Sequence, residues 1–139
     1  MILMYHGIGQ TENTWIRSRS NFERDLQTLY EKGYRPISLN DMARNRITTE
    51  AGYSPVVLTF DDGRSDNFRI LESGGRPMID PTTAVGILER FHRDHPDFPL
   101  EATFFLHGRQ PFGQEKWLQY KLNYLISAGM DIGNHTLTH

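Results

Sequence analysis

The sequence contains no cysteine and no apolar run long enough to cross a membrane. Without cysteine, disulfides and thiolate metal sites are excluded, so any metal must be held by histidine, aspartate, glutamate or backbone oxygen. A membrane-spanning helix needs roughly 18 or more consecutive apolar residues, and we expect no membrane span. Residues 1–6 lack the basic start of a signal peptide, and this end of the sequence does not indicate where the protein is located.

An excess of charge of one sign is also missing. The chain has 15 basic and 17 acidic residues, without long blocks of like charge. Nucleic acid and anionic membrane surfaces are therefore not expected as partners. The length of 139 residues is enough for one hydrophobic core and too short for two ordinary domains, so we expect one domain over residues 1–139. The sequence does not specify an oligomeric state.

Strand-like and helix-like patterns alternate along the chain. Strands are expected at residues 1–6, 34–38, 56–60, 102–106 and 130–133, and helices at residues 20–33, 41–44, 81–95 and 115–128. Such alternation is typical of parallel βαβ units, so we expect the fold class to be α/β.

Capping signals mark the starts of two of these helices. Ser20 and Glu23 have the spacing of a capping box, in which each side chain bonds the other residue's backbone amide. Asp80 precedes a proline that suits the first helical position. Before that second helix, the polar residues 64–80 are expected to form an irregular excursion.

The strand at residues 56–60 ends in Asp61, Asp62 and Gly63. Neighbouring side chains on a strand point to opposite faces, so the two carboxylates can serve one site only if the chain bends here, and Gly63 permits a bend. His135 follows the last expected strand. In α/β folds, functional residues gather at the carboxyl ends of strands, where these three side chains are expected.

His135 and His139 are four residues apart, so one turn of chain places both imidazoles on one side. With one carboxylate they form the three-ligand set of a catalytic zinc, which keeps an open position for water. The second carboxylate would remain available to accept a proton. The pattern favours metal-assisted hydrolysis. The alternatives are a helix cap and solvated turn for the aspartates, and a polar terminus for the histidines.

Two segments resemble signature motifs of a known family. Thr-Phe-Asp-Asp-Gly at residues 59–63 and His-Thr-Leu-Thr-His at residues 135–139 resemble the first two motifs of the polysaccharide deacetylases, the NodB-homology domain of carbohydrate esterase family 4. Residues 102–106 and 132–134 resemble the strand between those motifs and the approach to the histidines. Met-Tyr-His at residues 4–6 resembles the opening strand of the subgroup that acts on extracellular polysaccharides.

This resemblance implies a distorted (β/α) barrel that removes N- or O-acetyl groups from a polysaccharide, with an N-acetylglucosamine polymer as the favoured substrate. It makes Asp61 the general base and assigns a divalent ion to Asp62, His135 and His139. Zinc is the expected ion, with cobalt, nickel or manganese as alternatives. Thr136 is expected to brace the histidine loop by hydrogen bonding. The family also implies a location in the bacterial cell envelope or outside the cell.

The family's later motifs, with an arginine that orients the base and a histidine that acts as general acid, are expected beyond His139. We therefore expect a partial barrel, truncated after the second motif. The excursion over residues 72–81 is longer than the family requires and is expected to shape the substrate groove or to mark a subgroup. His6 is a candidate for lining the site, and pairing with a backbone carbonyl is an equal alternative.

Two other functions remain open. The chain is alternatively a non-catalytic remnant of such a domain that binds carbohydrate or metal. A 2-His-1-carboxylate iron oxygenase uses the same ligand types, but its usual cupin-like all-β fold and His-x-Asp pair are not visible in the sequence. The sequence leaves the role of His107 undecided.

Overall fold

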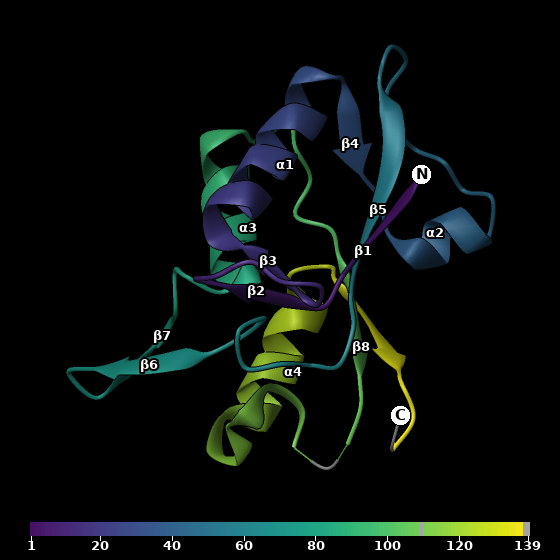
Figure 1. The fold of residues 1–139 in the computed structure, drawn as a ribbon. Helices are drawn as coiled ribbons and strands as arrows, with labels where there is room; N and C mark the ends of the chain where they lie inside the picture. The colour runs from purple at the N-terminus through teal and green to yellow at the C-terminus, as the bar shows by residue number, and fades with distance from the viewer. Residues whose placement is uncertain (109, 138–139) are drawn as a thin grey trace.

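The computed structural model describes residues 1–108 and 110–137 (Figure 1). The strands are β1 (Ile2–Tyr5), β2 (Gly7–Gly9), β3 (Ile16–Ser18), β4 (Tyr34–Pro36), β5 (Ser54–Phe60), β6 (Ile70–Ser73), β7 (Arg76–Ile79), β8 (Thr103–Leu106) and β9 (Asp131–Asn134). The α-helices are α1 (Arg19–Glu31), α2 (Leu39–Ala43), α3 (Ala84–Asp94) and α4 (Leu118–Ser127), and two short 3₁₀ turns, Pro111–Gly113 and Glu115–Trp117, precede α4.

A five-stranded parallel sheet organises the fold, with β5 at its centre. β4 pairs with the amino half of β5, and β1 and β8 pair with its carboxyl half. β9 pairs with β8 in parallel, so Phe105 lies opposite Gly133. Figure 1 shows α1, α3 and α4 stacked along one side of these strands and α2 on the other. The predicted α/β class is confirmed, because every pairing in this sheet is parallel and most strands are joined through helices.

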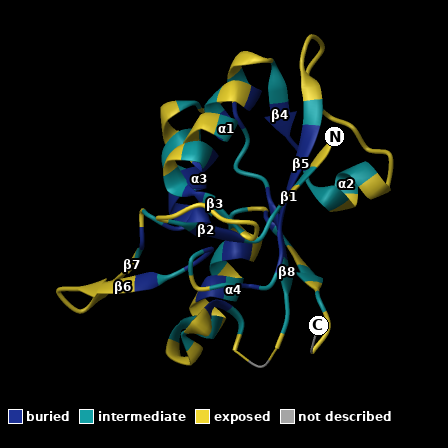
Figure 2. Cartoon of the chain, viewed as in Figure 1, coloured by how far each residue is buried: buried dark blue, intermediate teal, exposed yellow. Residues whose placement is uncertain are grey.

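The core lies between the sheet and the three stacked helices, as the dark interior in Figure 2 shows. Residues 56–60 have five per cent exposure or less, as expected for a central strand covered on both faces. The ring of Phe60 stacks on that of Phe104 with centroids 4.9 Å apart, and the ring of Phe22 meets Phe60 edge-on at 5.8 Å. Each fully buried phenylalanine contributes roughly 1.5–3 kcal/mol by leaving water. This packing fixes where β5 ends.

Both predicted helix caps were wrong. The capping residue of α1 is Ser18, whose hydroxyl accepts a hydrogen bond from the amide of Asn21. The acidic residue of the expected capping box is replaced by Glu12 from the preceding loop, which accepts the amide of Ser18 at 3.1 Å. Thr83 caps α3, whereas Asp80 accepts the amide of Thr82 at 2.9 Å. Hydrogen bonds of the loop before each helix therefore decide which of several suitable side chains acts as the cap.

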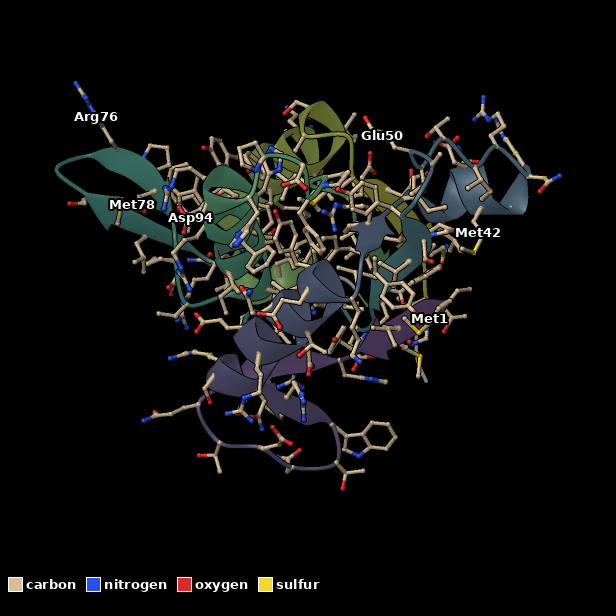
Figure 3. The ribbon with its side chains drawn as sticks, turned by 90° about the horizontal axis from the view of Figure 1, so that it is seen from above. Met1, Met42, Glu50, Arg76, Met78 and Asp94 are labelled. Carbon is tan, nitrogen blue, oxygen red and sulfur yellow. The ribbon has the colours of Figure 1, made fainter. Side chains whose placement is uncertain are left out.

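The excursion over residues 64–80 is more regular than predicted, because β6 and β7 form an antiparallel hairpin within it. Its turn is Gly74–Gly75, both with positive φ, which suits the tight turns that join two strands. Figure 3 shows Arg76 and Met78 on this hairpin, which projects away from the rest of the molecule. Gln114 anchors its base, accepting the amide of Ile70 at 2.8 Å and donating to the carbonyl of Ile70 at 3.0 Å.

Within residues 1–108 and 110–137, no helix is long and apolar enough to span a membrane.

Candidate active site

The chain turns sharply where β5 ends, as the sequence predicted. Asp62 has φ of 74° and Gly63 has φ of 58°, so two successive residues adopt the left-handed region. For a residue other than glycine this conformation costs roughly 1–3 kcal/mol, and such strain is concentrated at functional sites. At Gly63 a side chain is also excluded, because a Cβ would lie 2.9 Å from Cδ2 of Leu106.

Hydrogen bonds from three elements hold this aspartate turn, residues 61–63, in place. The amide of Asp61 donates to the carbonyl of Tyr5 in β1 at 2.9 Å. The side-chain amide of Asn67, which is fully buried, donates to the carbonyl of Asp61 at 3.4 Å. The amide of Phe112 donates to the carbonyl of Gly63 at 2.5 Å. The strained turn is thus fixed from both sides.

A buried lysine extends this support. Lys121 on α4 is fully buried, and its ammonium donates to the carbonyl of Phe112 at 3.0 Å. Burial lowers the pKa of Lys121 to about 8, and the charge of Arg69 acts in the same direction. Because Phe112 binds Gly63 through its amide, Lys121 is linked to the aspartate turn through one residue. This role could not be predicted from the sequence, in which Lys121 is one of several polar residues of a helix.

His135 reaches the same place from β9. Its amide donates to the carbonyl of Leu106 at 2.9 Å, which continues the pairing of β8 and β9 past the end of both strands. Nε2 of His135 lies 3.6 Å from Oδ1 of Asp62 and 4.0 Å from Oδ2 of Asp61. The expected meeting of the aspartates with this histidine is therefore present in the structure.

His107, which the sequence left undecided, lies next to the same carboxylate. It is the first residue after β8, and its Nε2 is 3.8 Å from Oδ1 of Asp62. Its ring centroid is 6.3 Å from that of His135. The signal for this residue was its position at the end of the strand beside β5, the same argument that selected His135.

Two of the predicted metal ligands have a spacing that suits one ion. Ligand atoms on a tetrahedral zinc, with bonds of 2.0–2.1 Å, lie about 3.3 Å apart. The distance of 3.6 Å between Asp62 Oδ1 and His135 Nε2 is close to that value. No group of three or more histidine or carboxylate side chains arranged to hold an ion is present among residues 1–108 and 110–137. His139, the predicted third ligand, lies outside the described residues, so the complete set stays a prediction.

Thr136 and His6 border this cluster. Thr136 has φ of 65°, its amide donates to Oδ1 of Asn134 at 2.7 Å, and its carbonyl accepts the amide of Gly108. These bonds join the loops after β8 and β9, so its backbone fits the predicted bracing role. His6 follows β1, and its ring packs against that of Trp15 with centroids 4.9 Å apart.

A shallow hollow of about 500 Å³ lies beside His135. It is lined by residues of β8, β9 and the two loops that follow them, among them Leu106, Asn134 and Thr136. The hollow thus lies over the ends of β8 and β9, and its lining includes both sequence neighbours of His135.

No family profile matches the chain. The chain is 24% identical over 140 residues to YxkH of Bacillus subtilis (strain 168), described as a polysaccharide deacetylase. This match covers 99% of the chain and 42% of YxkH. Its fold matches the deacetylase PplD of Streptococcus pyogenes, solved with acetate, at a TM-score of 0.69 and 24% identity over 99% of this chain and 56% of PplD. The resemblance to the polysaccharide deacetylases is confirmed.

A further solved structure agrees with this deacetylase fold. BA0330 from Bacillus anthracis, described as a polysaccharide deacetylase, superposes with a TM-score of 0.63 and 20% identity, over 99% of this chain and 39% of that one. The five-stranded sheet thus corresponds to part of the (β/α) barrel of these deacetylases, as expected. The chain spans about half the length of the relatives it matches.

Proposed function

We propose that the chain carries the first part of the active site of a metal-dependent deacetylase that removes acetyl groups from a polysaccharide. The observation that carries this proposal is the convergence of Asp61, Asp62 and His135 at the carboxyl ends of β5 and β9. The deacetylase fold and the acetate bound to PplD, which is the acid product of a deacetylation, support it. The favoured substrate is a polymer of N-acetylglucosamine, at the cell envelope or outside the cell.

The positions of the side chains suggest separate roles in metal binding and proton transfer. Asp62 and His135, with His139, would hold a divalent ion, and zinc suits a carboxylate and imidazoles. Such an ion, when bound, supplies the Lewis acidity that polarises an acetyl carbonyl and makes a water nucleophilic near neutral pH. Oδ2 of Asp61 lies 4.0 Å from the same His135 Nε2, and Asp61 is 9% exposed. It takes the proton of the attacking water as general base.

The turn brings both carboxylates to one imidazole. Because Asp62 has a positive φ, its side chain leaves the alternation of the strand, and both carboxylates approach the same imidazole. Adjacent carboxylates that share a site differ in protonation when one of them faces a cation. One carboxylate therefore serves as ligand and its neighbour as base.

Acetate release from an N-acetylglucosamine tetramer tests this function. It is measured with this chain and with the product of its complete reading frame, before and after removal of metal by a chelator and dialysis. We expect acetate release that stops on metal removal and returns with zinc. Release that continues unchanged without metal, or that is absent from the complete product, would overturn the proposal.

A second candidate is a module that binds metal or carbohydrate without turnover. It is supported by the described residues 1–108 and 110–137, among which no three histidine or carboxylate side chains are arranged to hold an ion. It predicts oligosaccharide binding without acetate release, also in the product of the complete reading frame.

A further inference from the structure

Trp15 is an exposed side chain on a firmly held backbone. It lies between β2 and β3, and 63% of its surface is exposed. Its amide donates to Oδ1 of Asn13 at 2.9 Å, and its carbonyl accepts the amide of Gly7 at 2.9 Å. The same Asn13 oxygen also accepts the amide of Ile16 at 3.0 Å. The loop thus presents the indole in one defined position.

An exposed indole on a rigid loop is unusual for a side chain of this size. Burying an aromatic side chain removes roughly 150–250 Å² from water, which stabilises a fold by a few kcal/mol. Tryptophan is also among the residues most enriched where proteins recognise ligands and partners. The second tryptophan of the chain, Trp117, is more covered, and its indole N–H donates to Glu72 at 3.3 Å.

The loop of Trp15 lies beside the aspartate turn. His6, whose ring packs on Trp15, directly follows Tyr5, and the carbonyl of Tyr5 accepts the amide of Asp61. β2 packs closely against the segment after the turn, since a Cβ at Gly7 would lie 2.7 Å from Nε of Arg64. Trp15 is therefore joined to the aspartate turn through His6 and Tyr5.

A hollow of about 280 Å³ adjoins the indole and the imidazole. Its polar wall is largely committed within the loop: the Glu12 carboxylate binds Arg17 and the side chain of Asn21. Three rings, those of Tyr5, His6 and Trp15, are available to a ligand in the wall of this hollow. A pyranose ring has an apolar C–H face that suits flat rings and hydroxyl groups at its edge that remain in water. An anionic ligand is disfavoured by the carboxylate beside the hollow.

We propose that Trp15, backed by His6, is a stacking platform for a sugar ring of the polysaccharide next to the ring that loses its acetyl group. The identity of the polymer rests on the proposed function. The platform explains why the loop is held by its backbone while its largest side chain stays in water. It also gives His6 a role beside the reacting groups.

Binding of an N-acetylglucosamine tetramer in metal-free buffer tests the platform in the product of the complete reading frame, measured by isothermal titration calorimetry in every variant and by tryptophan fluorescence where Trp15 is present. The Trp117→Phe variant leaves Trp15 as the indole of this segment, and we expect it to bind as the parent does, with a change in emission. Trp15→Ala should raise Kd about tenfold, in the range of 1–3 kcal/mol that stacking on an aromatic side chain contributes, and Trp15→Phe should raise it less. In turnover, Trp15→Ala should raise KM by a similar factor and leave kcat within about twofold, because it removes binding shared by substrate and transition state.

Equal Kd for Trp15→Ala and the parent overturns the platform, and so does the absence of binding by the parent. Circular dichroism melting of Trp15→Ala, expected to match the parent because the side chain is exposed, excludes misfolding as the cause of weaker binding. The two proposals fail in distinguishable ways. Binding that depends on Trp15 without acetate release contradicts the proposed function alone, whereas acetate release with an unchanged KM in Trp15→Ala contradicts the platform alone.

Discussion

The two ends of the parallel strands hold charged groups in contrasting ways. At the amino end, the buried Arg35 binds Asp97 at 2.6 Å, and its guanidinium lies between the rings of Tyr30 and Tyr53, at 4.4 and 4.0 Å. At the carboxyl end, the nitrogen–oxygen distances from His135 to the two aspartates are 3.6 and 4.0 Å.

Direct contact closes the amino end, whereas the distances at the carboxyl end exceed a hydrogen bond and suit an ion or water between the groups. In the proposed function, the same sheet therefore supplies stability at one end and chemistry at the other. This division is familiar from (β/α) barrels, in which residues at the carboxyl ends of the strands are catalytic.

The largest expected effect is on kcat. To compare the two ends, one carboxylate at each end is replaced by its isosteric amide. Asp61→Asn should lower kcat for acetate release by about 10²–10⁴-fold, the usual contribution of a general base, with little change in melting temperature. Asp97→Asn should do the reverse, lowering the melting temperature while kcat stays near the parent value. Acetate assays and thermal melts of both variants make the comparison, and loss of activity in both would contradict it.

The second effect concerns stability at the amino end. Arg35→Leu removes the ion pair and both ring contacts of a buried guanidinium, and it should cost about 3 kcal/mol of unfolding free energy. Urea unfolding measures this loss. Arg46→Leu is the matched control, since Arg46 forms an exposed pair with Asp41, and it should change stability little. Similar losses of unfolding free energy in the two variants would show that the buried Arg35 contributes no more than an exposed arginine.

The third effect tests the support under the aspartate turn. Lys121→Met keeps the length of the side chain but removes the donor to the Phe112 carbonyl, so the turn should lose its fixed geometry. We expect kcat to fall about tenfold with KM nearly unchanged, because a small displacement of the base mainly affects the reacting step. Lys116→Met, at an exposed lysine paired with Glu72, is the control and should leave kcat unchanged. An unaltered kcat in Lys121→Met would show that the lysine has no positioning role.

The smallest effect is a pH dependence at the amino end. Burial, with the charges of Asp131 and Asp41, raises the pKa of Glu101 from 4.5 to about 7. The folded protein therefore holds this proton more tightly than the unfolded chain, and stability should fall as pH rises from 4.5 through 7. Because Glu101 is partly exposed, solvent screening reduces the linked effect, so above that range Glu101→Gln should be more stable than the parent by about 1 kcal/mol, and near the lower limit the two should be equal. Thermal melts across this range measure the difference in stability between the parent and Glu101→Gln. A difference that does not change with pH would show that the titration of Glu101 is not its cause.

The central strand and the pairing of its end with His135 could be predicted because they depend on local patterns. Residues 56–60 form a continuous apolar run, and a parallel sheet brings the ends of its strands to one edge. The parts that were missed depend on contacts that residue type and spacing do not reveal. Glu12 shifted the cap of α1 to Ser18, and the fold brought His107 to Asp62.

The supporting lysine was missed for a related reason. Lys121 is buried because α4 packs beside Phe112, and the sequence of α4 alone does not reveal that partner. The hairpin of residues 70–79 was missed because its strands have four residues each and one of them contains Pro77, so the glycine turn is the main signal.

Zinc affinity is the most direct test of the central claim that the carboxyl end is a metal site with separate ligand and base. The affinity is measured by competition with a chelating indicator for the parent, Asp62→Ala, His135→Ala and Asp61→Asn. Loss of a ligand should weaken binding by at least about 100-fold in the first two variants, whereas Asp61→Asn, which alters only a neighbour of the ligands, should stay within about tenfold of the parent. Zinc bound equally well without Asp62 and His135 would contradict the account.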